Sequence, residues 1–120
     1  MREIKFRVFQ DNEMIYQDAP GVYGTKHFLD KCYEDGILMQ YTGLKDKNNI
    51  EIYDGDIVTV YHTGEVGLTG TVEYDDDETA YMIRTRDFES SEIVGTSFSR
   101  HLEVIGNIHE NPELYGHSTR

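Results

Sequence analysis

Four groups of residues in this 120-residue sequence could take part in chemistry: an acidic run, five histidines, a single cysteine and a glycine-rich stretch. The acidic run is Asp75, Asp76, Asp77 and Glu78, and four adjacent carboxylates could collect a hard cation such as calcium or magnesium. The run lacks the alternating spacing and central glycine of an EF-hand loop, and neighbouring side chains at a hairpin tip diverge. We therefore interpret it as a solvated hairpin tip and a candidate acidic surface.

The histidines and the cysteine form no catalytic or metal-binding pattern. The histidines are scattered without the i, i+4 spacing or the CxxC partners of a zinc site: His27, His62, His101, His109 and His117. Cys32 falls on the apolar face of a predicted helix, which favours a buried, inert thiol over a nucleophile. We expect no catalytic residue, no metal ligand and no cofactor.

The glycine-rich stretch contains Gly64, Gly67 and Gly70, which could suggest a phosphate cradle. Neither a following helix nor a neighbouring lysine supports that interpretation. The sequence also lacks a nucleophile elbow, a Walker loop and a dinucleotide fingerprint. We therefore expect a protein that is not an enzyme.

The charge of the chain is unevenly distributed. The net charge is −12, of which residues 1–47 carry −1 and residues 48–120 carry −11. An acidic field repels phosphate backbones, so nucleic-acid binding is not expected unless a local patch overrides it. One candidate basic and aromatic patch consists of Lys5, Arg7, Tyr41, Lys45 and Lys47. The simpler explanation is that the charge keeps a small domain soluble.

The first part of the chain is predicted to contain strands and one short helix. Ile4, Phe6 and Val8 alternate with Lys5 and Arg7, as in a strand with one buried and one solvated face. Residues 11–12 form a turn signal, and residues 14–16 are predicted to return as the second strand of a hairpin. The apolar spacing over residues 25–35 indicates a helix, and residues 37–41 return to an extended pattern.

The remainder of the chain has the pattern of several short strands. We expect a polar connection at residues 42–49 and strands at residues 50–53, 57–61, 71–74, 80–85 and 102–108. A carboxylate beside Gly55 is expected to bind backbone N–H groups in the turn at residues 54–56, and a bulge is expected at Gly106. The apolar residues Ile52, Ile57, Val58 and Val60 are predicted to be core. These features suggest a small barrel or sandwich.

The length of the chain favours one domain, and its composition favours a cytoplasmic location. A chain of 120 residues can bury its own core, and with one cysteine it cannot form an intramolecular disulfide. The start lacks the apolar run of a signal peptide, and no segment approaches the roughly 20 apolar residues of a membrane span. We expect no membrane partner.

A central motif and both ends of the chain resemble the YopX family of phage and prophage proteins. The central motif is residues 37–48, ILMQYTGLKDKN, followed by residues 51–58, EIYDGDIV. The start MREIKFRV and residues 103–114, EVIGNIHENPEL, also match that family, so the resemblance covers nearly the full chain. It implies a mainly β protein with an SH3-like barrel at residues 48–120, after a strand, a helix and a lead-in strand in residues 1–47. The family brings no known molecular activity.

The chain departs from the family pattern at Asn49, where a glycine is usual, at Ile50, where a lysine is usual, and at Asp54, where a glutamate is usual. Asparagine tolerates the left-handed backbone better than most residues, so we expect the turn at Asn49 to survive. Losing the lysine argues against a phosphate clamp in this motif.

Three classes of function remain. The preferred one is a non-enzymatic accessory protein that binds another protein or its own copies, because strand edges and hairpins offer interfaces. The second is an acidic decoy that imitates DNA, which requires carboxylates aligned on one face. The third is weak nucleic-acid binding through the basic and aromatic patch.

Overall fold

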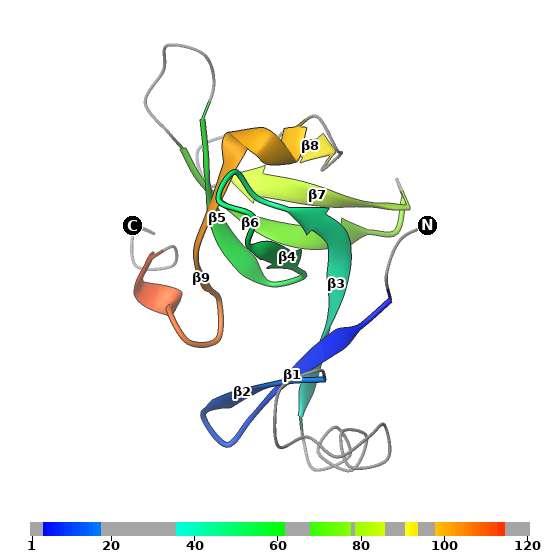
Figure 1. Ribbon diagram of the computed structural model, residues 1–120, viewed down its shortest axis with the longest axis vertical. Helices are drawn as coiled ribbons and strands as arrows, with labels where there is room; N and C mark the ends of the chain where they lie inside the picture. Colours follow the sequence, from blue (N-terminus) through cyan, green and yellow to red (C-terminus); the bar gives the residue numbers. More distant parts are fainter. Residues whose placement is uncertain are drawn as a thin grey trace. The chain divides into compact units, whose positions relative to one another are not determined.

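The computed structural model describes residues 4–17, 36–61, 68–77, 79–85, 91–93 and 98–114 (Figure 1). The chain divides into two compact units, Met1–Tyr41 and Thr42–Arg120. From the sequence, the barrel part of the chain is predicted to begin at Asn48. That the whole chain is one domain stays a prediction.

The first unit is built on a β-hairpin and the strand that follows it. Strand β1, Phe6–Gln10, pairs antiparallel with β2, Glu13–Tyr16. Asp11 and Asn12 connect them with φ values of 54° and 63°, the left-handed conformation that a tight hairpin turn requires at both positions. On its other side β1 pairs antiparallel with the start of β3, Ile37–Lys45. The predicted hairpin is confirmed.

The prediction that Lys5 and Arg7 form a solvated face is wrong, because both residues are buried, with exposed fractions of 8% and 3%. Aromatic rings explain how the strand tolerates them. The Lys5 Nζ lies 5.0 Å from the centre of the Tyr41 ring, and the Arg7 guanidinium carbon lies 5.9 Å from the centre of the Tyr16 ring. The negative faces of these rings attract the two cations.

Within its described residues, the second unit contains six further strands and two short 3-10 helices. The helices are η1, Phe98–His101, and η2, Pro112–Leu114. The strands are β4, Glu51–Tyr53, β5, Asp56–Val60, β6, Leu68–Asp75, β7, Ala80–Thr85, β8, Ser91–Ile93, and β9, Leu102–Asn107. Five of them form one sheet in the order β8-β7-β6-β5-β9 (Figure 1). The mainly β class is confirmed.

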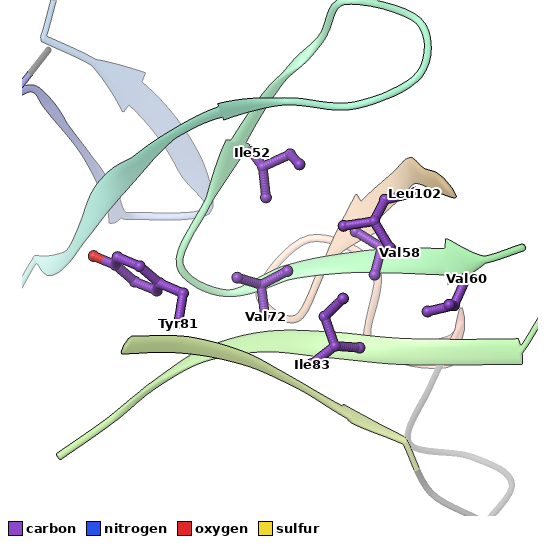
Figure 2. Close-up of a cluster of buried hydrophobic side chains, with 7 residues drawn as sticks. All are labelled: Ile52, Val58, Val60, Val72, Tyr81, Ile83 and Leu102. Atoms are coloured by element: carbon purple, nitrogen blue, oxygen red, sulfur yellow. The ribbon is translucent and has the colours of Figure 1, made fainter. Parts of the chain in front are cut away.

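The core of the second unit is an aliphatic cluster capped by one tyrosine. Figure 2 shows side chains from β4, β5, β6, β7 and β9 converging: Ile52, Val58, Val60, Val72, Tyr81, Ile83 and Leu102. Ile57 is fully buried as well. The four core residues predicted from the sequence are therefore confirmed. Burying one such aliphatic side chain stabilises the fold by about 1.5–3 kcal/mol.

The predicted polar connection at residues 42–49 is partly wrong, because β3 continues to Lys45. Thr42 explains the continuation: its hydroxyl donates to the Ile52 carbonyl at 2.8 Å and accepts the Leu44 N–H at 3.2 Å. These bonds attach the end of β3 to β4, although the segment has a polar composition. Strand β8 was not predicted, and the predicted helix at residues 25–35 lies outside the described residues.

An irregularity interrupts the pairing of β5 with β9. Ile57 faces Gly106 and Val58 faces Val104, so Ile105 is the extra residue of a bulge. The bulge expected at Gly106 is confirmed to within one residue. Over the ranges that the structure describes, no helix is long and apolar enough to cross a membrane.

Candidate functional site

The most recognisable motif of the chain is organised around the buried carboxylate of Asp46. One oxygen accepts the N–H groups of Asn48 and Ile50 at 2.8 and 2.9 Å, and the other accepts the Val104 N–H at 2.8 Å. Carboxylate bonds to backbone N–H groups are charge-assisted and therefore strong. Asp46 thus holds its own turn and attaches that turn to β9.

A backbone bond continues this attachment, because the Lys47 N–H donates to the Leu102 carbonyl at 3.0 Å. Strand β9 pairs with β5 on one side, and on its other side it meets the turn at residues 46–50. The turn covers groups that would otherwise be an open sheet edge. Asn49, with a φ of 68°, adopts the left-handed conformation expected of it.

Polar groups in the second half of the motif, residues 51–58, are also hydrogen-bonded within the protein. Asp56 is buried and accepts the Tyr53 N–H at 2.7 Å, which confirms the predicted carboxylate turn. Gly55, at a φ of 92°, donates its N–H to Val72 and accepts the Ile108 N–H through its carbonyl. The turn therefore joins β6 to the segment after β9.

The predicted acidic surface lies at the tip of the β6–β7 hairpin. The Asp75 carboxylate accepts the Asp77 N–H at 2.9 Å, and Asp76 is exposed. Arg84 lies 3.2 Å from Glu73 and 4.0 Å from Asp75, so a cation interrupts the acidic face. Glu78 lies outside the described residues. In the part of the chain that the structure describes, no group of three or more histidine, cysteine or acidic side chains could hold a metal ion.

The five residues of the predicted basic and aromatic patch are in two different environments. Lys5, Arg7 and Tyr41 are buried in the first unit, whereas Lys45 and Lys47 are exposed in the second unit. The structure brings Lys5 and Tyr41 together, since the Tyr41 N–H also donates to the Lys5 carbonyl at 2.9 Å. A nucleic-acid role for the patch stays a prediction.

Lys47 belongs to a polar cluster at the start of β9. Its Nζ lies 4.4 Å from the centre of the Tyr61 ring, and the Tyr61 hydroxyl donates to Glu103 at 2.9 Å. The hydrogen bond to Glu103 is the main cause of a raised Tyr61 pKa, with desolvation and the charge of Glu103 adding to it. The neutral phenol is therefore favoured in the folded protein.

The second unit also exposes large apolar side chains. Ile50, Ile105, Ile108 and Leu114 have exposed fractions of 48%, 38%, 41% and 38%. Ile50 lies next to β9 because the Asp46 carboxylate binds the N–H groups of both Ile50 and Val104. Ile105 is the bulged residue of β9, and Ile108 and Leu114 follow that strand. We call these four residues the β9 apolar surface.

The segment after β9 is fixed by two asparagines. The Asn107 side-chain oxygen accepts the N–H groups of His109 and Glu110, and its Nδ2 donates to Glu110 at 2.8 Å. Asn111 accepts the Asn107 N–H at 3.2 Å. Sequence reasoning did not single out Asp46, Asn107 or the β9 apolar surface. The polar residues following Asp46 and Asn107 were the available signal for carboxylate and amide turns.

These observations define the class of the protein. It is small and mainly β, with two compact units, and its signature residues stabilise turns and strand edges. The YopX protein family matches residues 5–115, and the chain belongs to that family. The chain is also similar to a crystal structure of protein EF1440 from Enterococcus faecalis, at 26% identity and a TM-score of 0.64. That match covers 95% of this chain and 99% of the other. Among curated proteins, none matches this chain.

Proposed function

We propose that this protein is a non-enzymatic accessory module of a phage or prophage, which acts in the bacterial cytoplasm by binding another protein or its own copies. One observation carries the proposal. The signature residues are engaged in bonds within the scaffold, while the β9 apolar surface presents four large side chains to solvent. Exposed apolar side chains that lie together are typical of a protein interaction site, and we propose that these four form one surface.

We also propose that the second unit is an SH3-like barrel. The antiparallel neighbours β5, β6, β7 and β8, and the return of β9 beside β5, support this assignment. The turn at residues 46–50 supports it further, because it covers the outer side of β9. A small barrel of this kind can present strands and loops to a partner.

The two other functions have less support. An acidic decoy requires carboxylates in an uninterrupted array, whereas Arg84 pairs with both Glu73 and Asp75. Nucleic-acid binding requires exposed cations, whereas two of the four cations in the patch, Lys5 and Arg7, are buried.

The test combines light scattering on the purified chain with capture from lysogenic host cells. We expect either a molar mass above that of one chain, or a captured protein that re-forms a stoichiometric complex from purified components. An Asp76→Ala variant, changed at the hairpin tip, should behave like the wild type. A chain that stays monomeric at high concentration and forms no stoichiometric complex contradicts the proposal.

A further inference from the structure

The β9 apolar surface has opposite charges at its two ends. Figure 1 shows that β9 leads from η1 at one end to the turn and η2 at the other. Arg100 lies in the last turn of η1, and Lys47 lies at the same end because its N–H is bonded to the Leu102 carbonyl. Glu110 and Glu113 follow β9 at the opposite end. The surface is therefore cationic before the strand and anionic after it.

Glu103 lies at the cationic end and keeps its negative charge, because the hydrogen bond that it accepts from Tyr61 comes from a neutral phenol. Lys47 and Arg100 are exposed there while Glu103 is half-buried, so the exposed side chains of this end are mainly cationic. At the anionic end, Glu110 and Glu113 are exposed on a segment that Asn107 and Asn111 hold in place. Both ends are thus attached firmly enough to present a defined pattern of charge.

A surface with an apolar middle and opposite charges at its ends is complementary to a copy of itself. When two copies meet about a two-fold axis with antiparallel β9 strands, the cationic end of each faces the anionic end of the other. A two-fold interface uses the same patch on both subunits and needs this self-complementarity. Like charges that meet in a wrong alignment repel each other, so the charges also select the register.

We propose that the protein forms a two-fold homodimer through the β9 apolar surface, with Lys47 and Arg100 of one copy facing Glu110 and Glu113 of the other. Ile50, Ile105 and Ile108 then form the desolvated centre of the interface, and the charges form its rim. This proposal rests on the proposed binding or assembly function and specifies the partner as a second copy of this chain.

The experiment is sedimentation equilibrium on the full chain and on two charge-reversal variants. The variant Lys47→Glu/Arg100→Glu has two acidic ends, and the variant Glu110→Lys/Glu113→Lys has two basic ends. Each should raise the dimer dissociation constant by at least about tenfold. An equimolar mixture of the two variants should restore association close to that of the wild type, because every contact again joins opposite charges.

A matched control is Asp76→Lys/Asp77→Lys, which makes the same change of charge as Glu110→Lys/Glu113→Lys, but at the exposed β6–β7 tip. It should leave the dissociation constant unchanged. Thermal unfolding confirms that each variant is folded, and recovery in the mixture cannot come from misfolded chains.

Three outcomes overturn the homodimer: a monomeric wild type, charge variants that do not recover when mixed, or a control that weakens association as much as they do. A monomeric wild type that forms a stoichiometric complex with a different protein overturns this inference and leaves the proposed function standing. A monomer without any such complex overturns both.

Discussion

The Asp46 side chain accepts a backbone hydrogen bond at the edge of a sheet. A backbone carbonyl of a neighbouring strand would ordinarily accept the Val104 N–H, and here a carboxylate oxygen does so. Its other oxygen organises the turn from which the side chain comes. A short polar turn thereby replaces an additional strand on the outer side of β9.

Replacing Asp46 should therefore destabilise the protein strongly. Asp46→Ala removes the acceptor of three backbone N–H groups, and we expect the free energy of unfolding to fall by about 3 kcal/mol or more. Asp46→Asn keeps one side-chain oxygen and should lose less. The measurement is urea unfolding followed by circular dichroism. Asp76→Ala, at an exposed position, should change the same quantity by less than about 0.5 kcal/mol, and equal effects of the two alanine variants would refute this role.

Tyr61 should titrate above its ordinary pKa of 10.0, because Glu103 accepts its proton-bearing hydroxyl in a hydrogen bond. Since the folded pKa is the higher one, this contribution to stability is complete below pH 10.0 and is lost as the pH rises through the folded pKa. Glu103→Gln should lower the pKa of Tyr61 toward its ordinary value. Carbon-13 NMR of labelled tyrosine measures it.

Asp76→Asn is the matched control for this titration, because Asp76 is exposed at the β6–β7 hairpin tip and makes no bond to Tyr61 that the structure shows. It should leave the pKa of Tyr61 unchanged. An unchanged Tyr61 pKa in Glu103→Gln would show that the hydrogen bond does not exist in solution.

Among the elements, β9 combines a bulge with a close backbone approach. A Cβ atom on Gly106 would lie 2.6 Å from Oδ1, 2.8 Å from Cγ and 3.0 Å from Cβ of Asn111. Asn111 cannot move away freely, because its side chain accepts the Asn107 N–H and its own N–H donates to the Asn107 carbonyl. Gly106 thus allows the turn after β9 to fold back on the strand.

Gly106→Ala should lower the free energy of unfolding by about 1–3 kcal/mol, as overpacking does elsewhere. In an Asn111→Gly background, which lacks the three clashing atoms, the same substitution should cost at least about 1 kcal/mol less. Chemical denaturation of the four proteins measures this coupling. An equal cost in both backgrounds would mean that Asn111 is not the obstacle.

Local patterns were sufficient to predict several elements. The Asp11–Asn12 turn, β7 and the core residues of β5 follow from turn chemistry and β-branched composition. The end of β3 and the burial of Lys5 and Arg7 did not follow, because they depend on contacts with residues of other strands: Ile52, Tyr41 and Tyr16. Strand β8 has too few residues to give a periodic signal.

At the scale of the whole molecule, the family motif and the binding surface have different roles. The motif residues Asp46 and Asp56 accept backbone hydrogen bonds and are buried, so they maintain the scaffold. The candidate contact residues lie on β9 and after it, and the sequence did not distinguish them from ordinary strand residues. Their grouping depends on the pairing of β9 with β5 and on the turn at residues 46–50.

The most direct test of this division is NMR on a mixture of isotope-labelled and unlabelled chains, which detects contacts between copies only. We expect intermolecular cross-peaks from the methyl groups of Ile105 and Ile108, and none from the buried methyl groups of Ile52 and Val58. Cross-peaks that arise only from Ile37 and Leu38 in the first unit, or no intermolecular cross-peaks at all, would contradict an assembly surface on β9.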